Sequence, residues 1–131
     1  MKIILLSGKP NTGKTHALLS LYEKLKGNDK CDVGPKKQIY NGPDFECVLE
    51  CKTNGKKGAI YSHGDTQYLF FENLIKYADR DILIIAYSQQ FSYPWDEEVA
   101  KNPYHHVVEK KEKGDKDDDR VCAEIMKLLF K

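Results

Sequence analysis

Residues 7–15 read SGKPNTGKT, a stretch whose residue types and spacing suit the binding of phosphate groups. Gly8 and Gly13 permit positive φ angles and close backbone approach, so that consecutive N–H groups can turn toward an anion. Lys14 can reach the outer phosphates of a triphosphate, and the Thr15 hydroxyl can ligate Mg²⁺. We therefore predict that a nucleoside triphosphate and Mg²⁺ bind here, through Gly8, Lys9, Pro10, Asn11, Thr12, Gly13, Lys14, Thr15 and His16.

Such a loop requires a strand before it and a helix after it, because the positive end of the helix then faces the anion. Residues 2–7 form a short continuous apolar run, which is typical of a strand buried on both faces. Residues 16–28 carry apolar side chains at helical spacing and finish with Gly27 and Asn28, which commonly end helices. Both elements are expected; the alternative is a glycine-rich turn with a solvated lysine.

A second acidic residue should lie beside this loop, because open α/β sheets bind ligands at the carboxyl ends of their parallel strands. Asp65 follows the apolar run 59–61 and is expected at that edge. Asp81 precedes the run 82–87 and is expected at the opposite edge. We therefore predict that Asp65 and Thr15 hold Mg²⁺. Capping the helix after it is the alternative role for Asp65.

His63 is the candidate for orienting water or a substrate hydroxyl near the γ-phosphate. Filling space at a strand end is the alternative role for this histidine. Together with the two residues above, it completes the predicted catalytic set of Lys14, His63 and Asp65.

Several other polar and aromatic residues have two interpretations each. Gln89 or Gln90 could position an attacking water or belong to a polar loop. Arg120 could stabilise the charge of phosphoryl transfer or pair with neighbouring aspartates. Residues 93–95 (Tyr-Pro-Trp) could stack on a base or cover the sheet. Residues 110–111 (Lys-Lys) and the charge run 113–120 are expected to be solvated.

The order of elements predicts a single α/β domain over residues 1–131, with helices on both sides of a mostly parallel five-stranded sheet. Asn54 and Gly55 mark a hairpin, so the strand 45–52 should be antiparallel to its partner, and we place it at the sheet edge. The expected strands are 2–7, 45–52, 58–63, 82–87 and 104–111, and the expected helices are 16–27, 66–78, 96–101 and a last one beginning near 117.

Residues 1–27 resemble the P-loop nucleoside triphosphatases, because Gly8, Gly13, Lys14 and Thr15 fit G-x-x-x-x-G-K-[ST]. GKPNTGKT is similar to the G-x-P-N-x-G-K-[ST] form of bacterial Ras-like GTPases, and the order of elements is also Ras-like to about residue 87. The guanine-reading N-K-x-D motif does not occur after residue 80, however. No threonine occurs in 27–44 to serve as a switch residue, and residue 68, where D-x-x-G would need glycine, is tyrosine.

The resemblance therefore implies a P-loop NTPase-like three-layer α/β/α fold with one antiparallel edge strand, and Mg-ATP as the ligand, with GTP left open. The expected activity is slow, Mg²⁺-dependent hydrolysis of the nucleotide. A small-molecule or nucleotide kinase is one alternative, although two arginines in total argue against an arginine-rich lid. A non-catalytic binding module, with a protein partner at loops 27–44 and 88–103, is the other.

The composition gives no sign of a nucleic acid or membrane partner. With 21 basic and 20 acidic residues, the formal net charge is +1, which provides no overall attraction to polyanions. No apolar run is long enough for a signal peptide or a membrane span. The four cysteines, at 31, 47, 51 and 122, form no C-x-x-C pair. We expect reduced thiols and a cytoplasmic protein.

Overall fold

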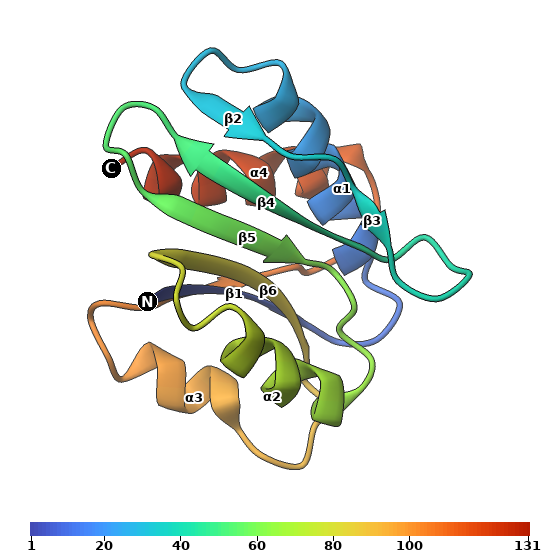
Figure 1. Cartoon of the computed structure of the whole chain (residues 1–131). Helices are drawn as coiled ribbons and strands as arrows, with labels where there is room; N and C mark the ends of the chain where they lie inside the picture. The colour runs from blue at the N-terminus through green and yellow to red at the C-terminus, as the bar shows by residue number, and fades with distance from the viewer.

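The structure, a computed structural model that describes all 131 residues, is a mixed α/β fold with one seven-stranded sheet and four helices (Figure 1). The strands are β1 (Lys2–Gly8), β2 (Cys31–Val33), β3 (Lys37–Gln38), β4 (Phe45–Cys51), β5 (Lys57–Tyr61), β6 (Ile82–Ser88) and β7 (His106–Glu109). The helices are α1 (Lys14–Lys26), α2 (Gln67–Lys76), α3 (Trp95–Ala100) and α4 (Asp115–Leu129). None of these helices has the length and apolar character needed to cross a bilayer.

The strand order is β2-β4-β5-β6-β1-β7, and β3 also pairs with β4. Parallel pairing joins β5 to β6, β6 to β1, and β1 to β7. β4 is antiparallel to β5, β2 and β3, so it alone runs against the direction of the other strands. The sheet is therefore mostly parallel, as predicted.

The predicted five-stranded sheet with the strand 45–52 at its edge is wrong. The segment 27–44, expected as a long loop, contributes β2 and β3, and both pair with the outer side of β4. Because these strands are three and two residues long, they contain too few positions to show the alternation that marks a strand in sequence. The other elements lie within a few residues of their expected positions.

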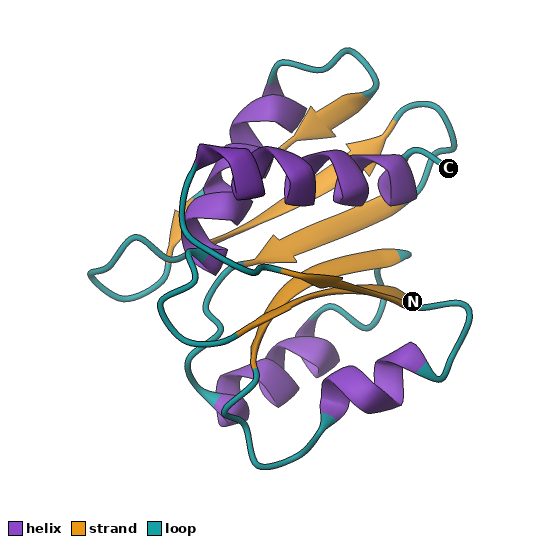
Figure 2. Ribbon diagram, turned by 180° about the vertical axis from the view of Figure 1, so that it is seen from behind, coloured by secondary structure: helices purple, strands orange, loops and turns teal.

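The helices cover both faces of the sheet (Figures 1 and 2). Buried residues of α1 and α4 pack with Ile4 and Leu6 in one core, and those of α2 and α3 pack with Ile3 and Leu5 in the other. Successive side chains of a strand point to opposite faces, so β1 supplies both cores and is buried on both sides. This confirms the expected burial, on both faces, of the strand that precedes residues 7–15.

All four cysteines are free and buried, in keeping with the expected reduced thiols. Burial raises the pKa of Cys31 to about 11 and that of Cys47 to about 12. Cys31 lies opposite Cys51 in the β2–β4 pairing. The two residues are distant in the sequence, so their spacing does not show that they are neighbours.

A buried ion cluster joins the end of β7 to the first turn of α4, where solvated charges were expected. Lys110 is 1% exposed, and its Nζ lies 3.1 Å from Asp117 Oδ2 and 3.1 Å from Asp118 Oδ1. Burial raises the pKa of Asp117, but hydrogen bonds from Arg120, from the backbone N–H groups of residues 112 and 111, and from Lys110 outweigh it and hold that pKa below its usual value. A run of alternating charges in the sequence does not show such pairing, because the partners approach only when α4 packs against β7.

Lys110→Met is expected to lower the free energy of unfolding at neutral pH by about 3–5 kcal/mol, because it removes the buried cation that lies between two buried carboxylates. The depressed pKa of Asp117 stabilises the fold above its unfolded pKa of about 3.9 and stops doing so as the pH falls, so the difference between variant and native should shrink in acid. Chemical denaturation measures both effects. Lys111→Met, at an exposed neighbour, should change stability by no more than about 0.5 kcal/mol. Equal losses for the two variants would contradict the buried pairing.

Candidate functional site

The loop between β1 and α1 has the backbone conformation that its glycines were predicted to allow. Gly13 has φ 87°, in the left-handed region, and Asn11 has φ 63°. A Cβ on Gly8 would lie 2.8 Å from Thr12 Oγ1 and 2.9 Å from the Lys110 carbonyl oxygen, distances that leave no room for a side chain. Gly8 is thus required for space, and Gly13 for its backbone angles.

The amino end of α1 is open toward a cleft of about 340 Å³. Gly13 is the N-cap residue and has no side chain with which to bond the first N–H groups, and the first turn contains no acidic residue. These N–H groups and the positive end of the helix dipole therefore form a site suited to an anion.

Lys14 brings a positive charge to the same place. Its side chain is largely buried, with 7% exposed, and its Nζ donates to the carbonyl oxygens of Gly8 and Lys9 at 3.1 Å each. Burial lowers the pKa of Lys14, and the nearby Asp65 carboxylate opposes this shift. The carbonyls of Gly8 and Lys9 are neutral, so the Asp65 carboxylate is the charge that partly balances the Lys14 ammonium.

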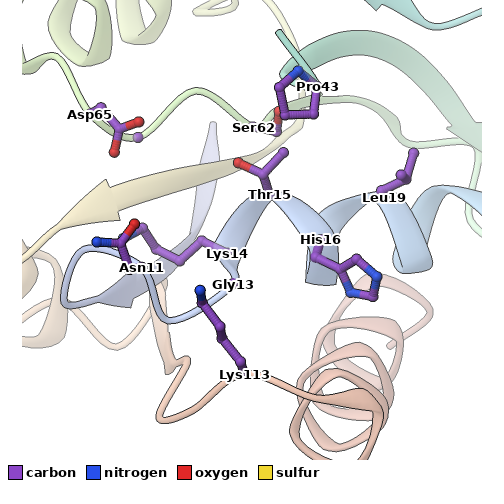
Figure 3. Close-up of a pocket in the computed structure, with 11 residues that line it drawn as sticks. Asn11, Gly13, Lys14, Thr15, His16, Leu19, Pro43, Ser62, Asp65 and Lys113 are labelled. Carbon is purple, nitrogen blue, oxygen red and sulfur yellow. The ribbon is translucent and has the colours of Figure 1, made fainter.

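Figure 3 shows the residues that line the cleft, with Asp65 and the Lys14 side chain on one side of Thr15 and His16 on the other. Of the predicted loop residues, the cleft contacts Asn11, Gly13, Lys14, Thr15 and His16, but not Gly8, Lys9, Pro10 or Thr12. Lys113, from the run expected to be solvated, also lines it.

Asp44, which is not among the predicted site residues, connects Thr15 to the rest of the site. Thr15 Oγ1 donates to Asp44 Oδ1 at 2.7 Å, and Ser62 Oγ donates to the same oxygen at 3.2 Å. The other oxygen, Oδ2, lies 2.7 Å from His63 Nδ1. Since the Thr15 proton is committed to Asp44, the lone pairs of that hydroxyl remain free to contact a cation.

Strand direction could have identified Asp44 in the sequence. It immediately precedes β4, and because β4 is antiparallel to β5, the start of β4 lies at the same edge as the end of β5. The predicted hairpin implies this geometry, because a strand that is antiparallel to its neighbour begins at the edge where that neighbour ends.

Asp65 lies where the strand directions predicted. It lines the cleft together with Lys14 and Thr15, and one ligand atom each of Asp44, His63 and Asp65 lie within 4.8 Å of one another. Gly64 beside it has no space for a side chain, since a Cβ there would be 2.9 Å from the Ala86 Cβ and 3.4 Å from Lys14 Cε. Glycine at residue 64 thus leaves space for the Lys14 side chain, and the next residue, Asp65, brings a carboxylate close to its ammonium.

Asp81 lies at the opposite edge, as predicted. Its Oδ2 accepts a hydrogen bond from the N–H of Lys57, the first residue of β5, and its carbonyl accepts one from the N–H of Lys2, the first residue of β1. The Asp81 carboxylate is therefore a structural acceptor at the amino ends of the strands.

The cleft is not lined by Gln89, Gln90, Arg120 or residues 93–95, for each of which two roles were open. Gln89 Nε2 donates to Ser7 Oγ at 3.3 Å and to Glu109 at 3.1 Å. Arg120 pairs with Asp117 and Glu124 along α4, which is the salt-bridge interpretation. Trp95 packs in an aromatic cluster with Phe70 and Phe71, so this segment covers the sheet.

No protein-family model, no curated protein and no solved structure matches this chain. The proposals below are therefore supported by the residues of the cleft and their geometry.

The bond between Thr15 and Asp44 should be measurable as a coupling energy. In a double-mutant cycle of Thr15→Val and Asp44→Ala, followed by urea unfolding, we expect about 1.5–3 kcal/mol, the range for a hydrogen bond to a charged group. Thr15→Val combined with Asp81→Asn is the control and should be additive within about 0.5 kcal/mol, because Asp81 lies at the other edge. Additivity in the first cycle would show that the hydroxyl does not bond Asp44 in solution.

Proposed function

We propose that the chain binds a nucleoside triphosphate with Mg²⁺ in this cleft and hydrolyses it slowly. The observation that carries the proposal is the placement of Lys14 and Thr15 at an open helix N-terminus, facing Asp65. A P-loop NTPase-like three-layer α/β/α fold is part of the proposal, supported by the loop and by the helices on both sheet faces. ATP is the expected nucleotide, and GTP stays open.

The phosphate groups would bind in the cleft at the uncapped amino end of α1. The first N–H groups of α1 have no side-chain cap and are available to phosphate oxygens. Lys14 would exchange the carbonyls of Gly8 and Lys9 for the outer phosphates. Exchanging two neutral acceptors for a charged one strengthens each hydrogen bond of the ammonium.

The donor atoms near Thr15 fit Mg²⁺, which prefers oxygen ligands and keeps several of its waters. Thr15 and Asp65 would hold the ion, and Asp44 would orient the Thr15 hydroxyl from behind through its 2.7 Å hydrogen bond. When bound, Mg²⁺ neutralises charge on the phosphates and orients them.

His63 does not line the cleft itself, but its chain neighbours Ser62 and Gly64 do, and its imidazole is suited to accept a proton. When Nδ1 donates to Asp44, Nε2 is the acceptor on the other side of the ring, where Thr66 Oγ1 lies 3.2 Å away. Hydrolysis is expected to be slow, because neither arginine contributes to the cleft: Arg120 is paired on α4, and Arg80 lies beside residues of β2 and β4 elsewhere.

Lys14→Ala tests whether the loop binds a triphosphate at all. We expect the native chain to bind ATP or GTP in the presence of Mg²⁺, and the variant to bind at least tenfold more weakly, because the only buried ammonium at the anion site is gone. Isothermal titration calorimetry with and without Mg²⁺ measures both. Equal affinities for native and variant would refute the proposal. Lys9→Ala, which removes an exposed lysine of the same loop, is the control.

Asp65→Asn and Asp81→Asn separate the two edges of the sheet. Asp65→Asn should weaken Mg²⁺-dependent affinity or turnover at least tenfold, about 1.4 kcal/mol, since it removes a charged oxygen ligand. Asp81→Asn should leave both nearly unchanged, because its carboxylate bonds the N–H of Lys57 far from the cleft. Phosphate release and calorimetry give the two readouts. A larger effect at Asp81 would overturn the assignment.

A further inference from the structure

Thr66 precedes α2 as its N-cap residue, yet its side chain does not cap the helix. An N-cap threonine usually accepts a hydrogen bond from an N–H of the first turn. Here Thr66 Oγ1 instead lies 3.2 Å from Nε2 of His63. The helix thus forgoes its usual cap, and the hydroxyl is directed at an imidazole.

His63 is itself oriented by a carboxylate. Its Nδ1 lies 2.7 Å from Asp44 Oδ2. When the carboxylate is ionised and the ring is neutral, Nδ1 donates to Oδ2 and Nε2 accepts the Thr66 proton. The side chains of His63 and Asp44 are 13% and 15% exposed, whereas Thr66 is exposed. A hydroxyl, a histidine and an aspartate in this order are the arrangement that activates serine and threonine nucleophiles.

This arrangement lies beside the proposed phosphate cleft, which is lined by Ser62, Gly64 and Asp65 of the same segment. Asp65, between His63 and Thr66 in the chain, lines the cleft, and its carboxylate lies within 4.8 Å of ligand atoms of His63 and Asp44. Asp44 also bonds Thr15 at the helix N-terminus. The electrophile that the neighbouring Lys14 and open N–H groups suit is a phosphoryl group.

We propose that Thr66 accepts the γ-phosphoryl group of the bound nucleoside triphosphate, so that the chain phosphorylates itself. This inference rests on the proposed function, which supplies the nucleotide. Thr66 Oγ1 forms a bond to the γ-phosphorus while the bond from that phosphorus to the bridging oxygen breaks. The hydroxyl proton passes to His63 Nε2, and the nucleoside diphosphate leaves with the electron pair. Asp44 acts as a positioning residue through the ring of His63.

The product would be stabilised where it forms. Phosphothreonine at residue 66 would lie at the amino end of α2, a ten-residue helix with no acidic residue in its first turn and no side-chain cap. A phosphate there complements the helix dipole and can bond the free N–H groups.

The test is intact-mass spectrometry of the full chain after incubation with Mg-ATP or Mg-GTP, with peptide fragmentation to locate the group. We expect a single added phosphoryl group on Thr66. Thr66→Val, which keeps the shape, should remain unmodified while binding nucleotide as the native chain does in calorimetry. Thr66→Ser should be modified, and Thr53→Val, at an exposed turn threonine, should behave as native.

His63→Gln and Asp44→Asn should slow the modification, measured at saturating nucleotide, by about 10²–10⁴-fold, the range for losing a positioned base. The outcomes separate the two proposals. A native chain that binds nucleotide and releases phosphate but carries none on Thr66 overturns this inference and leaves the proposed function standing. A phosphoryl group on another residue overturns it as well, and a chain that binds no triphosphate overturns both.

Discussion

The carboxyl ends of β1, β5 and β6 lie at one edge of the sheet, and the antiparallel strand β4 begins at that edge. Everything in the cleft depends on this arrangement of directions. The loop with Lys14 and Thr15 follows β1, the segment with His63 and Asp65 follows β5, and Asp44 precedes β4. If β4 were parallel to β5, Asp44 would lie at the far edge with Asp81, and Thr15 would lose its partner.

The buried ion cluster is bonded to the start of the loop between β1 and α1. The N–H of Lys110 donates to the Ser7 carbonyl at 2.8 Å, and the Lys110 carbonyl is one of the atoms that restrict Gly8 to glycine. The cluster thus holds Lys110 in place against Ser7 and Gly8, where the loop begins. The carbonyls of Gly8 and Lys9 in turn accept hydrogen bonds from the Lys14 ammonium. The charges of the Lys110 cluster, which stabilise the fold, therefore lie next to the loop that holds the Lys14 ammonium.

Local patterns were sufficient to predict the main elements and part of the site. The apolar run of β1, the helical spacing of α1 and the Asn54–Gly55 turn are patterns within a few residues. The structure confirms the strand, the helix and the hairpin that they predict. Strand direction alone placed Asp65 and Asp81 at opposite edges. The short strands β2 and β3 carry no such pattern, and the pairing of Lys110 with Asp117 forms only through tertiary packing. Asp44 was within reach of the same argument about strand direction.

The central claim is that a triphosphate binds at the amino end of α1, and two-dimensional NMR of the nitrogen-15-labelled chain during titration with Mg-ATP and Mg-GTP tests it most directly. The account predicts the largest amide shifts at Gly13, Lys14 and Thr15, with smaller ones at Asp44 and Asp65 and none at Lys57 or Asp81. Shifts confined to the far edge of the sheet, or no shifts with either nucleotide, would contradict it.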